Sequence, residues 1–497
     1  MNINSSLRIR HTASRQGRRK AMSLKIFWII FLSAMLATMF AYLAYAFSEL
    51  PMMATPPEAT QKSSKTPQNT NHRHHHNRKK TVLQKIRAHN NQQPLALLAD
   101  ASADGGTLDV APFPQIESKL PPRMYTCRCY PLVKYAFATR GFTMKQHQDD
   151  YKNAWIIWKT GTDIDMESLL PWQRPSHFPG ERLMDRKGTM YQVLRQYSLR
   201  QNVPLDFVPE TFILYDDKDK NRFVERLDNG GMDMPWVLKR SKASRGRGVT
   251  MLGPHSTELR TLRDELEDGP NKTGHIIQSY IRNEWTFQGH KCDLRVYVLV
   301  ASIQPLIVYY HDGIVRTAIG LHNEEDFGES KAHLTNVSQN KQNRTAWEPV
   351  KMFDQLDTEL QEYSKREGAK LNISDPINHI RNQIKRILGV VFASFKSRIS
   401  LNDLPIDNAF ALMGADFVID KDLKVWLLEM QLGPQLVGES HAKKTALLQE
   451  VITTTIDVVE EVFHKQERKE PLLPLSKASN FDLVYFDQSY QFEIIEE

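Results

Sequence analysis

The sequence predicts a mixed fold of strands and helices, α/β to α+β, beginning near residue 120. Two observations support this. Aromatic residues return at this point after a long polar stretch, and apolar runs of strand length then alternate with helical patterns. Alternation of this kind indicates layered α and β structure rather than a helical bundle. Strands are expected at 236–239, 275–280, 294–301 and 425–430, and helices at 258–266 and 376–395.

Each predicted element follows from its own residues. The runs Trp236–Lys239 and Leu294–Ala301 are mainly apolar without alternation, which is typical of strands buried on both faces. The helix 376–395 is opened by Asp375 and Pro376, a capping residue followed by a proline in the first turn.

The excess positive charge lies at the N-terminus. Residues 1–100 hold 15 Lys and Arg against three acids, whereas the rest of the chain holds 50 against 55. The formal charge of +7 therefore reflects a basic tail, and the remaining part is slightly acidic. Because nucleic-acid binding needs a basic patch on a folded surface, the composition gives no reason to expect it.

Residues 26–47 are predicted to form a transmembrane helix. The stretch has 22 residues without a charge, and a helix of that length spans about 33 Å. The basic tail 1–25 precedes it, and the positive-inside rule would keep the N-terminus in the cytosol. A cleaved signal peptide and an organelle transit sequence are alternatives. The sequence thus predicts a single-pass membrane protein, with the side that carries the globular part left open.

A disordered stalk is expected at 48–119, because these residues are poor in aromatics and rich in Pro, Gln, Asn, Ser and His. The globular domain is expected at 120–470, followed by a C-terminal tail at 471–497. Three cysteines are too few for a disulfide framework in a chain of this size, so we interpret them as ordinary thiols: Cys127, Cys129 and Cys292.

Eight segments occur in an order that resembles the tubulin tyrosine ligase-like family. They are HFPG at 177–180, FVPETFIL at 207–214, WVLKRSKASRGRGV at 236–249, IIQSYI at 276–281, GHKCDLRVYVLV at 289–300, DGIVRTA at 312–318, HLTNVSQNK at 333–341 and GADFVIDKDLKVWLLEMQLGPQL at 414–436. The resemblance covers roughly residues 150–445. It implies an ATP-grasp fold that joins a carboxylate to an amine, using ATP and Mg²⁺, through an acyl phosphate.

The resemblance also implies a nucleotide site. Lys239 ends an apolar strand before a basic, glycine-containing loop, which by itself is either a flexible turn or a phosphate-binding loop. In the family, this lysine contacts phosphates and the loop closes over them. The matching residues are Lys239, Ser244, Arg245, Gly246, Arg247 and Gly248 for the phosphates, Gln278, Tyr280 and Ile281 for the adenine, and Lys291, Asp293, Thr335 and Asn336 as further nucleotide contacts.

Arg295 and Arg316 resemble the arginines that orient the substrate in this family. A planar guanidinium holds a carboxylate by two hydrogen bonds and so fixes its direction as well as its charge. Residue type alone would favour ordinary surface arginines, and it is the flanking KCDLR and DGIVR segments that support the functional interpretation.

Asp416 and Glu429 are candidate magnesium ligands. They lie on two apolar segments joined by a predicted hairpin near Asp420, and antiparallel pairing would bring the carboxylates together. A buried salt bridge is an equally good interpretation of these two acids. Gln431 stands where the family usually has Asn, and its extra methylene displaces the amide oxygen from the expected ligand position.

The expected function is addition of glutamate to acidic C-terminal tails of tubulin, with tubulin and glutamate implied by the resemblance alone. One alternative is an inactive, membrane-attached module that binds tubulin or another partner. The other is a ligase that acts on a luminal or organellar protein.

Overall fold

The computed structural model describes residues 121–145, 151–241, 248–268, 274–323, 335, 347–368, 371–401, 404–438 and 441–487. The predicted transmembrane helix 26–47 and stalk 48–119 lie outside these ranges, and both remain predictions. In the ranges described, no helix combines the length and apolar character that a membrane crossing requires.

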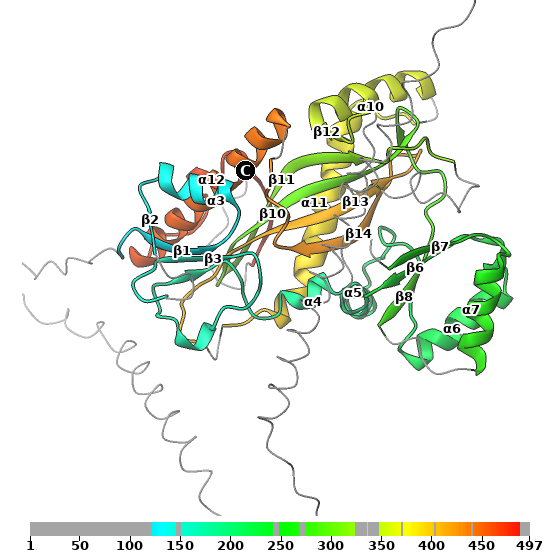
Figure 1. The fold of residues 1–497 in the computed structure, drawn as a ribbon, viewed down its shortest axis with the longest axis horizontal. Coiled ribbons are helices and arrows are strands. Elements are labelled where there is room, and N and C mark those ends of the chain that lie inside the picture. Colours follow the sequence, from blue (N-terminus) through cyan, green and yellow to red (C-terminus); the bar gives the residue numbers. More distant parts are fainter. Residues whose placement is uncertain are drawn as a thin grey trace, which may run out of the picture. The chain divides into compact units, whose positions relative to one another are not determined.

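A small parallel sheet opens the described part, in the order β2-β1-β3-β4 (Figure 1). Its strands are β1 (Met124–Arg128), β2 (Thr143–Met144), β3 (Ile156–Lys159) and β4 (Arg174–Pro175). Helix α3 (Pro131–Thr139) connects β1 to β2 and packs against α12 (Ala442–Glu467). Aromatic rings fill the space between them, with Tyr125 stacked on Phe137 at 4.1 Å between ring centroids.

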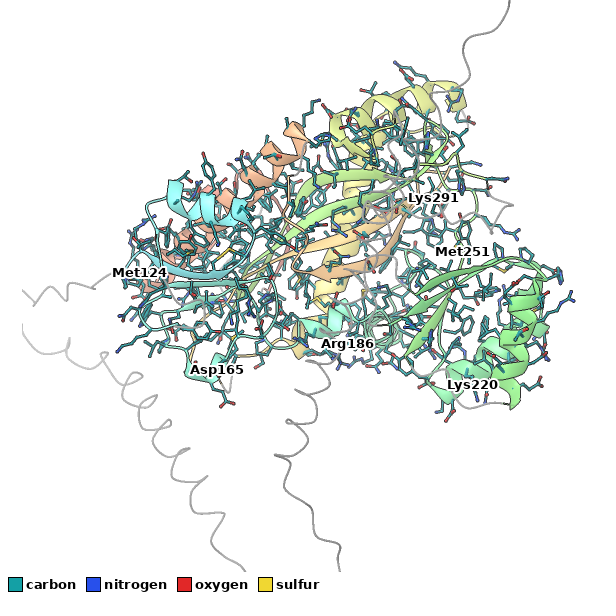
Figure 2. The ribbon with its side chains drawn as sticks, viewed as in Figure 1. Met124, Asp165, Arg186, Lys220, Met251 and Lys291 are labelled. Atoms are coloured by element: carbon teal, nitrogen blue, oxygen red, sulfur yellow. A yellow bond between two sulfur atoms is a disulfide. The ribbon has the colours of Figure 1, made fainter. Side chains whose placement is uncertain are left out.

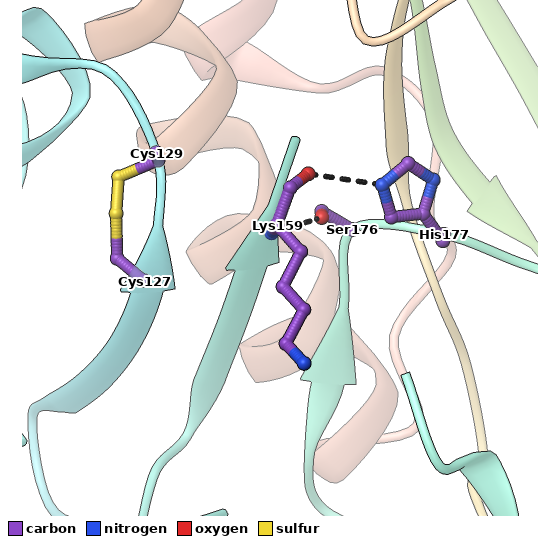
Figure 3. The surroundings of a disulfide bond; sticks show 5 residues. All are labelled: Cys127, Cys129, Lys159, Ser176 and His177. Atoms are coloured by element: carbon purple, nitrogen blue, oxygen red, sulfur yellow. Dashed lines mark hydrogen bonds between the residues drawn. A yellow bond between two sulfur atoms is a disulfide. The ribbon is translucent and has the colours of Figure 1, made fainter. Parts of the chain in front are cut away.

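Cys127 and Cys129 form a disulfide at the end of β1 (Figure 3). The interpretation of these residues as ordinary thiols was therefore wrong for this pair. Cys127 lies on β1 and Cys129 directly follows its last residue, and the Cα atoms of the two cysteines are 5.3 Å apart, within reach of a disulfide. Cys292 is a buried free thiol, as expected.

A second, antiparallel sheet has the order β5-β8-β6-β7. The strands are β5 (Thr211–Ile213), β6 (Trp236–Arg240), β7 (Val249–Leu252) and β8 (His275–Ser279). Helices α6 (Asp217–Asp228) and α7 (Thr257–Asp268) contribute to its separate apolar core, in which Phe223 lies edge-on to Trp236 at 5.1 Å. The strands and the helix predicted from 236–280 are thus present.

The largest sheet carries the order β12-β11-β10-β13-β14, with β15 against β11 and β9 against β10. The strands are β9 (Thr286–Phe287), β10 (His290–Ile303), β11 (Leu306–Thr317), β12 (Val350–Met352), β13 (Ala411–Ile419), β14 (Val425–Leu432) and β15 (Asp482–Phe486). The remaining elements are α4 (Arg182–Asp185), α5 (Lys187–Gln201), α10 (Phe353–Glu367), α11 (Pro376–Phe395), η1 (Met166–Ser168), η2 (Gly231–Asp233), η4 (Lys396–Arg398) and η5 (Ser476–Ala478).

Helices α11 and α12 cover opposite faces of this sheet. The buried residues of α11 share a core with Leu294 and Val298 of β10, whereas those of α12 share one with Tyr297 and Leu299. Helix α11 has the predicted bounds, and Asp375 caps it by accepting a hydrogen bond from the Asn378 amide at 3.1 Å. The mixed fold predicted from the sequence is confirmed.

The domain extends beyond residue 470, where the sequence analysis placed its end. Strand β15 pairs with the outer edge of β11, so at least part of the predicted tail belongs to the sheet. The physical reason is visible in the sequence, because residues 481–486 read FDLVYF, a short run rich in the β-branched and aromatic side chains that favour strands.

Candidate active site

One face of the large sheet carries most of the polar candidates. Lys291, Asp293 and Arg295 occupy alternate positions of β10, so they share a face (Figure 2 labels Lys291). The intervening Cys292 and Leu294 are buried in the core that includes α11. The strand period therefore separates a charged face from an apolar one.

Asp416 binds both of the predicted substrate-orienting arginines. Arg295 donates from Nε and Nη2 to the two carboxylate oxygens at 2.5 and 2.8 Å, and Arg316 donates from Nη2 at 2.8 Å. Burial would raise the pKa of Asp416, but the two guanidinium groups outweigh it and hold this pKa well below its usual range. The buried salt bridge that the sequence left open is thus present at this acid.

Asp293 extends the network to Thr335. Arg316 Nε donates to Asp293 Oδ1 at 2.5 Å, and the Thr335 hydroxyl donates to Oδ2. Burial raises the pKa of Asp293, and the Arg316 charge acts against that rise. Among the described residues, Nη1 of each arginine makes no hydrogen bond.

The predicted hairpin is present, and Asp416 lies directly opposite Glu429 in the β13–β14 register. Asp420 holds the turn: its Oδ1 accepts hydrogen bonds from the amides of Asp422 and Lys424 at 3.1 and 2.9 Å, and its Oδ2 accepts one from the Trp426 ring nitrogen at 2.9 Å. The turn acid is therefore structural, whereas the two acids inside the strands face the charged side of the sheet.

Both oxygens of Glu429 have partners. Lys187, the first residue of α5, lies 2.6 Å from Oε2, and the Gln431 amide nitrogen donates to Oε1 at 3.0 Å. Lys187 was not predicted. Its only local signal was its position beside Arg186, which Figure 2 labels, shortly after the HFPG segment.

Lys239 lies on β6 one residue before its end, because the strand continues to Arg240, and it reaches Gln278 on the neighbouring strand. Its ammonium donates to Gln278 Oε1 at 2.6 Å, and the Gln278 amide donates to the Thr211 hydroxyl at 2.8 Å. Burial and the nearby positive charge of Lys187 lower the pKa of Lys239 to about 8. The amide of Gln278 is therefore held by a lysine and a hydroxyl.

Lys291 forms a second cationic position. It bonds to the carboxylate of Glu284 and to the Tyr280 hydroxyl at 3.1 Å, and it lies over the Tyr280 ring at 4.6 Å. Burial would lower the pKa of Lys291, but Glu284 and Tyr280 outweigh it and the pKa is raised. Glu284 was not predicted as a site residue. Ile281, which was, lies next to Tyr280, just beyond the end of β8.

The predicted phosphate loop is described only at its ends. Ser244, Arg245, Gly246 and Arg247 lie outside the described residues, as does Asn336. Gly248 is described: its carbonyl accepts from the Arg240 amide at 3.1 Å, and its φ is +69°. A Cβ there would lie 2.9 Å from the Arg240 side chain, so the position favours glycine on both counts.

The HFPG segment is structural. His177 bonds to Glu181 at 2.7 Å and to the Lys159 carbonyl at 2.9 Å, which ties the segment to β3 (Figure 3). A Cβ on Gly180 would lie 2.2 Å from the Arg398 carbonyl, so this glycine permits a close approach of two backbones. The segment thereby fixes the chain just before Lys187.

The donor set fits magnesium. Asp416, Glu429 and Gln431 offer oxygen ligands, and magnesium uses one or two carboxylates with the rest from water and phosphates. Within the ranges described, no three His, Cys, Asp or Glu residues gather as a metal site, so a cation here would need those outside ligands. Lys187, Lys239 and Lys291 supply the positive charge that a triphosphate requires.

Comparison with known proteins identifies the family. The model of the tubulin-tyrosine ligase family matches residues 163–469, more than half of the chain. Among curated proteins, "Probable tubulin polyglutamylase TTLL2" of Mus musculus is 29% identical over 65% of this chain and 58% of its own length. "Protein polyglycylase TTLL10" of Mus musculus is 24% identical over 69% and 51%, and "Inactive polyglycylase TTLL10" of Homo sapiens 26% over 64% and 45%.

The chain thus spans about half the length of these relatives. The matched range contains the large sheet from β9 to β14, α5 and the antiparallel sheet, and every site residue described above falls within it. The chain belongs to the tubulin-tyrosine ligase family.

Proposed function

We propose that the chain is an ATP- and Mg²⁺-dependent ligase that adds glutamate to the acidic C-terminal tails of tubulin. The observation that carries the proposal is the gathering of three lysines and two arginines near paired acids. The arginines and Lys291 lie on the charged face of the large sheet, Lys187 of α5 contacts Glu429, and Lys239 of β6 lies near enough for Lys187, Lys291 and Glu429 to act on its pKa. This arrangement suits a reaction between two carboxylate-bearing substrates and a polyphosphate. The names of the polyglutamylase relatives support glutamate as the amino acid.

The residues have separate tasks in this proposal. ATP supplies the phosphoryl group that activates a carboxylate, and Mg²⁺ neutralises phosphate oxygens. Lys187, Lys239 and Lys291 hold the phosphates, because buried ammonium groups attract them strongly. The Nη1 groups of Arg295 and Arg316, which make no hydrogen bond to the described residues, orient a substrate carboxylate on the charged sheet face. Glu429 and Asp416, with Gln431, hold the cation.

A ligation assay tests the proposal. The purified full-length chain is incubated with tubulin, ATP, Mg²⁺ and labelled glutamate, glycine or tyrosine in parallel. Glutamate incorporation that depends on ATP and is lost in Glu429→Gln supports the proposal. Glycine incorporation would instead make the chain a polyglycylase, and incorporation that survives Glu429→Gln would contradict the metal assignment.

A second candidate is an inactive module that binds tubulin or another partner. Gln431 favours it, because its amide nitrogen occupies an oxygen of Glu429, the acid proposed to hold the cation, and one curated relative is named inactive. ATP binding without incorporation of any amino acid would establish this alternative. A protease-protection assay on sealed membranes decides whether a luminal or organellar substrate must replace tubulin, given the predicted helix at 26–47.

A further inference from the structure

Strand β11 contains one extra residue beside the charged network. The β10–β11 register pairs Arg295 with Ile314, but the next pair is Tyr297 with His311, so β11 advances three residues while β10 advances two. The extra residue lies at Asp312–Gly313, which is a β-bulge.

This bulge decides the face on which Arg316 lies. Tyr310 and Val315 belong to the same core as α11, although they are five positions apart and a regular strand would place them on opposite faces. A slip of one residue moves every following side chain to the other face. Without the bulge, Arg316 would point toward α11, away from Asp293 and Asp416.

Glycine is required inside the bulge by a backbone contact. A Cβ on Gly313 would lie 1.8 Å from the carbonyl oxygen of Arg295 and 3.0 Å from the Val296 Cα. Both atoms belong to the backbone of β10 and have little freedom to retreat. The bulge thus presses against the residue that carries the other network arginine.

Arg381 of α11 fastens the bulge from the opposite face. Its guanidinium bonds to both oxygens of Asp312, with Nη2 2.5 Å from Oδ2 and Nε 3.2 Å from Oδ1. The Tyr310 hydroxyl donates to Asp312 Oδ1 at 2.5 Å. Among the described strands, β15 pairs with β11 only up to Tyr310 and β12 only from Ile314, so the bulge falls between them.

We propose that Asp312, Gly313 and Arg381 are positioning residues for the two substrate-orienting arginines, an inference that rests on the proposed ligase function. The ion pair between Asp312 and Arg381 holds the bulge in place, and the bulge sets the face of the sheet on which Arg316 lies. Gly313 sets how closely β11 approaches Arg295. Asp312 and Arg381 meet on the α11 side of the sheet and not on the charged face. Gly313 has no side chain to place on either face.

The test replaces Arg381 by Met in the full-length chain, with Lys385→Met as the matched control. Lys385 lies one helical turn further on α11 and also ties the helix to the sheet, through Asp482 of β15 at 3.2 Å, but not to the bulge. Misplacement of a reacting group by about 1 Å costs on the order of 100-fold in rate. Arg381→Met should therefore lower kcat by about 100-fold, Lys385→Met should leave it nearly unchanged, and ATP affinity should be retained in both.

Arg381→Lys adds a rescue arm, because it keeps the charge and one hydrogen bond and should recover part of the lost kcat. Equal kcat in Arg381→Met and Lys385→Met would overturn the inference. If the wild-type chain ligates no amino acid, the proposed function fails, and crystal structures of the two variants then decide the positioning. The hydrogen bonds of Arg316 to Asp293 and Asp416 should be lost only in Arg381→Met, and their retention there would equally overturn it.

Discussion

Asp416 and Glu429 face each other across two strands, yet they are held differently. The side chain of Asp416 is 5% exposed and is bound by two arginines that are themselves buried. The side chain of Glu429 is 19% exposed and is bound by one lysine and one neutral amide. Both are acids inside apolar strands, but only the first is enclosed by permanent charges.

The difference separates a structural role from an exchangeable one. A carboxylate with two guanidinium partners loses much if it gives them up, because the arginines are then left buried without a counter-charge. A lysine has a single flexible ammonium, which can leave Glu429 for a phosphate while a cation takes its place. We therefore infer that Asp416 keeps its arginines when a cation binds, and that Glu429 is the acid that changes partners when substrates bind.

The largest effect is expected from Asp416→Asn. The substitution keeps the shape but removes the negative charge between Arg295 and Arg316, and breaking a buried ion pair costs about 3–5 kcal/mol. The free energy of unfolding, measured by urea denaturation, should fall by that amount. Glu429→Gln is the matched variant on the facing strand and should cost less, because its pair with Lys187 is more exposed, at 19% and 12% of the two side chains. Equal costs would remove the distinction between the two acids.

The next effect concerns activity rather than stability. Glu429→Gln should lower kcat for ligation by on the order of 100-fold or more, because it removes a charge that holds the cation at the reacting phosphate. The unfolding transition should hardly move. A variant that retains full activity would show that Glu429 is no magnesium ligand.

The local structure could be predicted from the sequence where one segment decides it. The period of β10 assigns Lys291, Asp293 and Arg295 to one face, and the apolar runs around Asp416 and Glu429 indicate a hairpin. Both features depend only on residues that are close in sequence, and both are present in the structure. The helix α11 has its expected bounds for the same reason, since its cap and its apolar stripe are both local.

Contacts between distant segments could not be predicted in this way. Lys187 meets Glu429, and Glu284 meets Lys291, only because α5 and the segment before β9 are brought to the large sheet by tertiary packing. The bulge at Gly313 is equally hidden, because one inserted residue leaves the apolar pattern of β11 almost unchanged while reversing the face of Arg316. Periodicity predicts faces, but it does not predict which faces meet or where a strand slips.

A third prediction uses the pKa of Lys239, which burial and Lys187 lower to about 8. Below pH 8 the ammonium is charged and can hold phosphate, whereas above it the folded chain loses this proton before the unfolded chain does. Nucleotide affinity should therefore fall as the pH rises from 7 to 9, by about tenfold over one unit past the pKa. The guanidinium of Lys239→Arg stays charged throughout this pH range. In this variant a plot of nucleotide affinity against pH should therefore show no midpoint near pH 8. A midpoint that persists in this variant would assign the effect to another group.

The smallest effect is expected from Gln431→Asn, which tests why Glu429 differs from Asp416. The Gln431 amide reaches Glu429 at 3.0 Å because its extra methylene lets it extend along the strand to a residue two positions away. Asn is shorter and should release this oxygen of Glu429, so the free energy of unfolding should fall by only about 0.5–1.5 kcal/mol, the range for one hydrogen bond. Mg²⁺ affinity, measured by calorimetry in the presence of a non-hydrolysable nucleotide, should rise severalfold.

Gln431→Leu is the control, because it also frees Glu429 but offers no amide oxygen. A gain in Mg²⁺ affinity in Gln431→Asn alone would identify residue 431 as a ligand position. An equal gain in both would mean that Gln431 only restrains Glu429, and a loss in Asn would show that glutamine is the better ligand here.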